Sequence, residues 1–183
     1  GVFSNGTAII VGDHNGKCAN SSVAHVFTSW PTSSGAAVGY DIVPEDGNYA
    51  WPHGSFDSAT GKMYLLSKYL VEYSDAGTTL PRSTKIATST PFEGGDGGDV
   101  EIVNSYLYTT EYNGNRVAVF KGIPTASASA SFYIGSPGVD TSAANKVVNT
   151  LQTNYMITNP QVATLGGAMA ISSDFDRKIY VWK

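Results

Sequence analysis

A short β-meander in residues 106–135 constrains the fold of this chain more than any other stretch. It contains three runs rich in β-branched and aromatic residues, YLYTTEY, RVAVFKG and SFYIG, separated by an Asn-Gly-Asn turn and by a small-residue loop that carries Pro124. Turn-forming Asn and Gly between two such runs are the strongest local sequence signal for a β-hairpin. We therefore predict three consecutive antiparallel strands here.

The same arrangement occurs a second time, near the start of the sequence. The segment VAHVFTSWPTSSGAAVGYDIV repeats the order of parts in RVAVFKGIPTASASASFYIG: a strand ending in Val-Phe, a Pro-Thr pair, a loop of small residues and an aromatic strand. The spacing between Phe27 and Phe120 equals the spacing between Pro31 and Pro124, so the register is kept. This is an internal repeat, and repeats of a few short strands are typical of β-propellers.

Extending the repeat along the chain predicts an all-β propeller of four-stranded antiparallel blades, about three and a half of them in one domain. The approximate bounds are 1–53, 54–97, 98–167 and, for a half blade of two strands, 168–183. The expected second strands are AIIVG, MYLLS, LYTTE and IYVWK, which makes Tyr64, Tyr108 and Tyr180 equivalent residues packed between blades. Residues 136–165 show no clear alternation and are expected to form a long connection, with one or two helical turns in AANKVVNTL.

Composition agrees with this fold and excludes several classes of protein. Charged residues make up 14% of the chain, against roughly 25% in an average domain, and turn-forming residues are abundant. A net charge of -4 with only three arginines leaves no basic surface for nucleic acid. No run approaches the roughly 18 apolar residues of a membrane span. The single cysteine, Cys18, has no intrachain disulfide partner.

Two tripeptides favour an exported or cell-surface protein over a cytosolic one. Asn5-Gly6-Thr7 and Asn20-Ser21-Ser22 fit the acceptor pattern for N-glycosylation and lie in turn-like contexts. Together with the low content of charged residues, they predict an extracellular location.

The stretches quoted above resemble NHL-repeat propellers, whose repeat reads P-x-G-V-x-x-D-G-x-x-L-Y-V-A-D-x-x-N-N-R-V-x-V-F-x-x-I-P-T. The resembling segments are YLYTTEYNGNRVAVFKGIPTASASASFYIGSP, GVFSNGTAIIVGDHNGK with VAHVFTSWPTSSGAA, WPHGSFDSATGKMYLL and DFDRKIYVWK. The resemblance implies four-stranded blades around a central channel, usually six in a ring, that most often present a binding surface. Some similar propellers are enzymes, namely metal-dependent lyases and hydrolases. The chain departs from the family after its second strands, where Gly12-Asp13, Thr110-Glu111 and Leu66-Ser67 replace the usual Ala-Asp.

Six polar residues lie in loops that would reach an end of such a channel. They precede a first strand or follow a second strand, and they are Asp13, His14, His53, Asp99, Glu111 and Tyr112. Two histidines with several carboxylates could bind a divalent cation, calcium or zinc, and activate water. However, no histidine pair has a local ligand spacing, and the acidic residues can instead accept hydrogen bonds from blade turns. We therefore predict a binding site at the channel mouth and assign no catalytic residue.

Three functions remain open from the sequence. The first is a non-catalytic binding or scaffold module for a protein, peptide or glycan, in which Trp30, Trp51 and Tyr112 could form an aromatic platform. The second is a metal-dependent propeller enzyme with its site at the channel mouth. The third is a structural subunit of an extracellular assembly. An unfinished ring leaves a raw edge, so either the chain is a fragment of a longer propeller, or a second copy or a partner chain completes the ring.

Overall fold

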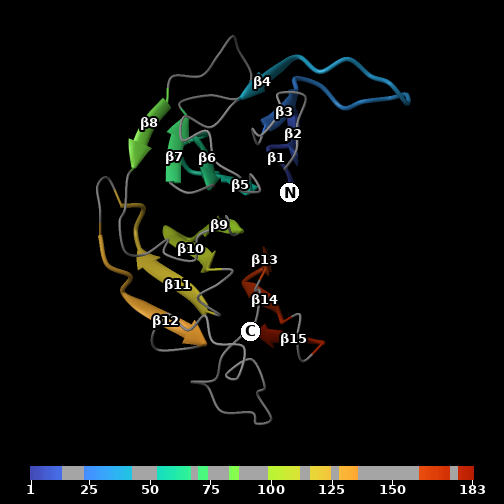
Figure 1. The fold of residues 1–183 in the computed structure, drawn as a ribbon. Coiled ribbons are helices and arrows are strands. Elements are labelled where there is room, and N and C mark those ends of the chain that lie inside the picture. The colour runs from blue at the N-terminus through green and yellow to red at the C-terminus, as the bar shows by residue number, and fades with distance from the viewer. Residues whose placement is uncertain are drawn as a thin grey trace.

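The chain folds into four antiparallel β-sheets, seen here in a computed structural model (Figure 1). The structure describes residues 1–13, 23–42, 53–66, 70–73, 83–86, 99–111, 116–124, 128–135, 161–173 and 177–183, with the backbone alone for 83–86. Over these ranges every regular element is a strand, and no helix is long and apolar enough to cross a membrane. The predicted all-β class is confirmed.

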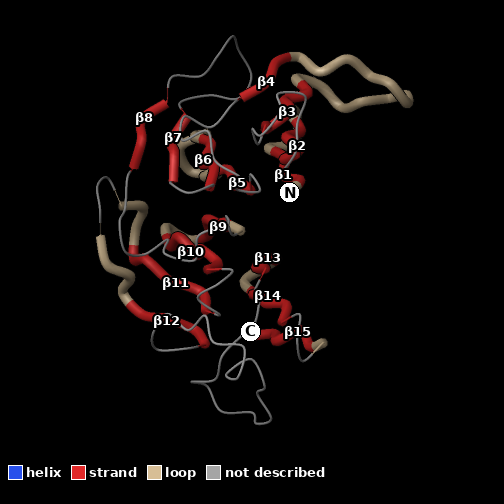
Figure 2. Tube along the Cα trace, viewed as in Figure 1, coloured by secondary structure: helices blue, strands red, loops and turns tan. Residues whose placement is uncertain are grey.

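The strands of each sheet follow one another in chain order, as expected for repeated meanders (Figure 2). Sheet A contains β1 (Val2–Ser4), β2 (Ile9–Asp13), β3 (Val23–Phe27) and β4 (Tyr40–Ile42). Sheet B contains β5 (His53–Phe56), β6 (Met63–Leu66), β7 (Leu70–Tyr73) and β8 (Ser83–Ile86). Sheet C contains β9 (Val100–Val103), β10 (Tyr106–Glu111), β11 (Arg116–Lys121) and β12 (Phe132–Gly135). Sheet D contains β13 (Gln161–Leu165), β14 (Ala168–Ser173) and β15 (Lys178–Trp182).

The first strands of the four sheets lie together in the middle of the molecule. Strand β5 contacts both β1 and β9, and β9 contacts β13. From this centre the sheets fan outward in an open arc, with sheets A and D at its two ends (Figure 1). Each first strand is therefore close to the first strand of the next sheet.

Three hydrophobic clusters fill the spaces between successive sheets, one between A and B, one between B and C, and one between C and D. Strand β6 shows why its sequence is continuously apolar. Met63 and Leu65 pack against sheet A, whereas Tyr64 and Leu66 pack against sheet C, and all four are buried. Because successive side chains of a strand point to opposite faces, a strand between two sheets needs apolar residues at every position.

The prediction for the last copy was wrong. A half blade of two strands was expected from residue 168, but sheet D has three described strands and begins with β13. The segment IYVWK therefore lies on a third strand, so Tyr180 is not equivalent to Tyr64 and Tyr108, which do pack between sheets. Strand β13 has only a weak apolar pattern in the sequence, because Val162 is its one fully buried residue. The helical turns expected in AANKVVNTL lie outside the described residues.

Candidate functional site

Asp99 lies directly before β9, at the point where the first strands meet. Its Oδ1 lies 3.4 Å from Nδ1 of His53 on β5, and its Oδ2 accepts a hydrogen bond of 3.2 Å from the backbone N–H of Val162 on β13. One carboxylate thus links sheets B, C and D. The contact brings together two of the residues that the sequence placed at the channel mouth, His53 and Asp99.

The backbone of Asp99 is also held in place. Its N–H donates to Oγ1 of Thr110 at 2.5 Å, and its carbonyl accepts from the N–H of Thr110 at 2.9 Å. Burial lowers the pKa of the Gly1 amine, and the negative charge of Asp99 opposes that shift. The start of sheet A is therefore also within electrostatic reach of this carboxylate.

Glu101 on β9 is a second acidic residue near Asp99, at the contact between β5 and β9. Burial, and then the nearby negative charge of Asp99, raise the pKa of its carboxyl to about 7, although a hydrogen bond from Oγ of Ser55 at 3.3 Å favours the charged form. The same Oγ accepts from the N–H of Ile102, which ties β5 to β9. Strand alternation in VEIV marks Glu101 as an ordinary exposed residue, so the sequence did not reveal it.

We expect Glu101 to make the protein less stable as the pH rises. Its pKa in the folded state lies above its ordinary value of 4.5, so the folded state holds the proton more tightly than the unfolded state. The resulting contribution to the free energy of unfolding is fully present below about pH 4.5 and is lost as the pH rises to about 7. Glu101→Gln should remove that dependence and raise the free energy of unfolding at pH 8, because glutamine carries no charge into the interior. We expect a gain of only about 1–2 kcal/mol, since solvent screens the partly exposed carboxyl. Urea unfolding from pH 4 to 8 checks this, and parallel pH profiles for the two proteins would contradict it.

Two other predicted site residues, Asp13 and Glu111, form ion pairs elsewhere in the structure. Asp13 lies in sheet A, where its Oδ2 is 3.6 Å from Nε2 of His25, and Nδ1 of His25 is 2.7 Å from Oδ1 of Asp41. Glu111 is buried and pairs with Arg116. His14 and Tyr112 lie outside the described residues. Within the described ranges, no group of three or more His, Cys, Asp or Glu side chains is arranged to hold a metal ion.

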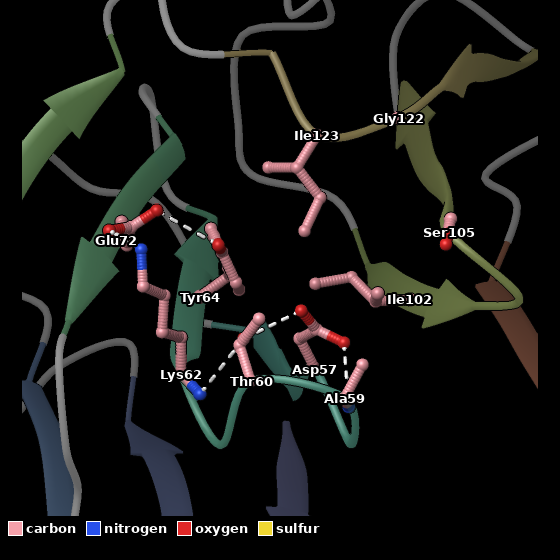
Figure 3. A pocket seen from close by; sticks show the side chains of 10 residues that line it. All are labelled: Asp57, Ala59, Thr60, Lys62, Tyr64, Glu72, Ile102, Ser105, Gly122 and Ile123. Atoms are coloured by element: carbon pink, nitrogen blue, oxygen red, sulfur yellow. Dashed lines mark hydrogen bonds and ion pairs between the residues drawn. The ribbon is translucent and has the colours of Figure 1, made fainter.

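A groove of about 360 Å³ opens between sheets B and C (Figure 3). Its lining comes from the β5–β6 turn, β6, β7, β9, the β9–β10 turn and the segment after β11. The lining residues are Asp57, Ala59, Thr60, Lys62, Tyr64, Glu72, Ile102, Ser105, Gly122 and Ile123. In Figure 3, Ile102 and Ile123 point toward the side that carries Tyr64 and Thr60. The groove therefore has one aliphatic wall and one polar wall.

The polar wall is fixed by hydrogen bonds. Glu72 accepts from Nζ of Lys62 at 2.7 Å and from the hydroxyl of Tyr64 at 2.9 Å, while Asp57 accepts from the hydroxyl of Thr60 at 2.6 Å. Burial, and then the hydrogen bond to Glu72, raise the pKa of Tyr64, so its hydroxyl stays protonated at neutral pH. Sequence reasoning missed this groove because its residues come from separate strands and share no local motif.

The aromatic platform predicted from the sequence can be described only at Trp30. Its side chain is exposed and donates a hydrogen bond to the carbonyl of Gly6 at 3.0 Å, whereas Trp51 and Tyr112 lie outside the described residues.

Comparison with known proteins assigns no family to this chain. No protein-family model matches it, and a search of curated proteins finds no significant match.

Proposed function

We propose that this chain is a β-propeller of the NHL type that acts as an exported, non-catalytic binding module, with the groove between sheets B and C as its ligand site. Two features support the propeller assignment: the first strands cluster at the centre, and each sheet packs face-on against the next. Sheets of this kind arranged around a common centre are what blades require. The exported location is supported by the glycosylation tripeptides, one of which begins at the exposed Asn5.

The observation that carries the binding function is the chemistry of the groove. Lys62, Tyr64 and Glu72 are held in one hydrogen-bonded set, so a ligand meets preorganised polar groups at little entropic cost. The opposite wall offers the aliphatic side chains of Ile102 and Ile123. This combination suits an oligosaccharide, whose hydroxyl groups can bond to the polar wall while its C–H faces pack on the aliphatic one.

A peptide fits the groove less well. Extended peptides commonly bind by pairing with an exposed strand edge. The strands of sheet B that line the groove offer no free edge, since β6 pairs with β5 and β7, and β7 pairs with β6 and β8.

We expect Glu72→Gln to weaken oligosaccharide binding at least tenfold, because it disturbs the bonds to both Lys62 and Tyr64. A panel of neutral oligosaccharides would be titrated into the protein by calorimetry, and the binding position mapped by NMR chemical shifts. Asp41→Asn on sheet A is the matched control and should leave the affinity unchanged. Binding that Glu72→Gln does not weaken, or no binding from the panel, would contradict a glycan site here.

The metal-dependent enzyme is the second proposal, and the observation in its favour is the contact between His53 and Asp99 at the centre of the arc. The observation against it is that both oxygens of Asp99 already have protein partners, namely His53 and the N–H groups of Val100 and Val162. Metal analysis of the purified protein decides between the two proposals.

A further inference from the structure

Sheet D exposes apolar side chains on the face that points away from sheet C. Ile179 and Val181 alternate on β15 with Tyr180, and they are 70% and 60% exposed. The register places Val181 beside Ala170, which pairs in turn with Ala163, so the neighbouring side chains on this face are small. Large aliphatic side chains this exposed over small neighbours are typical of a surface that another protein layer covers.

Sheet A has a similar face at the other end of the arc, on the side away from sheet B. Val2 on β1 is 73% exposed and pairs in register with Val11, which pairs with His25. Phe3 and Ile10, the neighbours with the opposite orientation, belong to the cluster between sheets A and B. The outward face of sheet A thus has one strongly exposed apolar residue, Val2, beside the half-buried Val11 and the paired His25 and Asp41, whereas that of sheet D has two, Ile179 and Val181.

The two end segments carry small net charges of opposite sign: residues 1–42 have Asp13 and Asp41 against Lys17, and residues 161–183 have Arg177, Lys178 and Lys183 against Asp174 and Asp176. Opposite charges on two surfaces steer them together and set their relative orientation.

We propose that sheet D of one copy of this chain packs face-on against sheet A of a second copy, and that the reciprocal contact closes two copies into one ring. The geometry is the one already used within the chain, where A packs on B, B on C and C on D. Two copies of four sheets stay within the upper limit of about eight blades for propellers. The contact is heterologous and closes after two copies, so it leaves no sheet face exposed at either end. This inference rests on the proposed propeller arrangement.

The first test is the mass of the protein in solution by light scattering after gel filtration. We expect about twice the 19.3 kDa of one chain. Val181→Glu on sheet D and Val2→Glu on sheet A should each weaken the dimer at least tenfold, because each places a charge in the contact. Val38→Glu, at an exposed loop position outside both faces, is the matched control and should remain dimeric. All three positions are exposed, so circular dichroism should show an unchanged fold.

Mixing the two variants gives a sharper test. In a head-to-tail dimer of Val181→Glu with Val2→Glu, both substitutions fall in one contact and the other contact is native, so the mixture should recover dimers that neither variant forms alone. If Val2→Glu has no effect, the contact is not between A and D. A monomer would show that residues of the same chain or solvent cover these faces, and masses above a dimer would show that two copies do not close. Each of these results overturns the inference. A monomer that still binds oligosaccharide would overturn the two-copy ring but leave the proposed ligand site in the groove intact.

Discussion

Replacing Glu111 with alanine should lower the free energy of unfolding by about 3–5 kcal/mol, because it leaves a buried cation without its counter-charge. The side chains of Glu111 and Arg116 are 1% and 5% exposed. They lie opposite each other in the register of β10 and β11, with Nε of Arg116 2.5 Å from Oε2 and its Nη2 3.3 Å from Oε1 of Glu111. The guanidinium also lies 3.9 Å from the ring centre of Tyr133, which holds it in the interior when the carboxylate is removed.

Urea unfolding at pH 7 measures this loss. The matched control is Lys62→Ala, which breaks another ion pair within one sheet, that of Lys62 with Glu72, whose side chains are 40% and 23% exposed. Since pairs near solvent contribute little, this control should lose no more than about 1 kcal/mol. The double variant Glu111→Leu with Arg116→Met should recover part of the loss, because no charge is then left buried. A similar loss in Glu111→Ala and in the control would show that the pair does not carry this stability.

The sheets could be predicted because their strands have a strong local signal. Runs such as VAVF in β11 and MYLL in β6 are apolar at every position, and the structure buries both of their faces between sheets. Strand β13 could not be found in this way, since it lies at the end of the arc and packs one residue, Val162, into the core between C and D. A strand with one buried face and few buried residues has little periodicity to detect.

The position of KIYVWK as a third strand can be recognised from the sequence itself. The segment SSDFDRKIYVWK matches TTEYNGNRVAVFK position by position with one gap, which aligns Lys178 with Arg116 and Trp182 with Phe120. This comparison identifies KIYVWK as a third strand. The interpretation as a second strand relied on the alignment of IYVWK with the other second strands around Tyr180 and on the match of DFDRKIYVWK to the family repeat. So short an apolar run with one tyrosine is a weak marker in a chain with eleven tyrosines.

The candidate sites divide in the same way. The proximity of His53 and Asp99 could be predicted, because both lie at the starts of first strands and the first strands of sheets B and C are in contact. The raised pKa of Glu101 could not, since it depends on how closely Asp99 approaches and on how deeply β9 is buried. Nor could the groove, where Lys62 and Ile123 line one space although they belong to different sheets.

Gly54→Ala should cost about 1–3 kcal/mol of unfolding free energy, because the backbone of β5 is packed directly against an aromatic ring. A Cβ at Gly54 would lie 2.3 Å from Cζ of Phe3, and 2.7 Å from the carbonyl oxygen of Tyr64. Phe3 cannot move aside freely, since its ring centre is 5.6 Å from that of Phe56 in the cluster between sheets A and B. Glycine inside a strand often marks such a close approach, and here it is what lets β1 lie against β5.

A double-mutant cycle with Phe3→Leu tests this explanation by urea unfolding of four proteins. The shorter leucine leaves space for the new methyl group, so the double variant should lose at least about 0.5 kcal/mol less than the sum of the two single losses. The recovery should be incomplete, because the carbonyl of Tyr64 is part of the backbone and stays close to the added Cβ. Strictly additive losses would mean that Phe3 does not limit the space at Gly54.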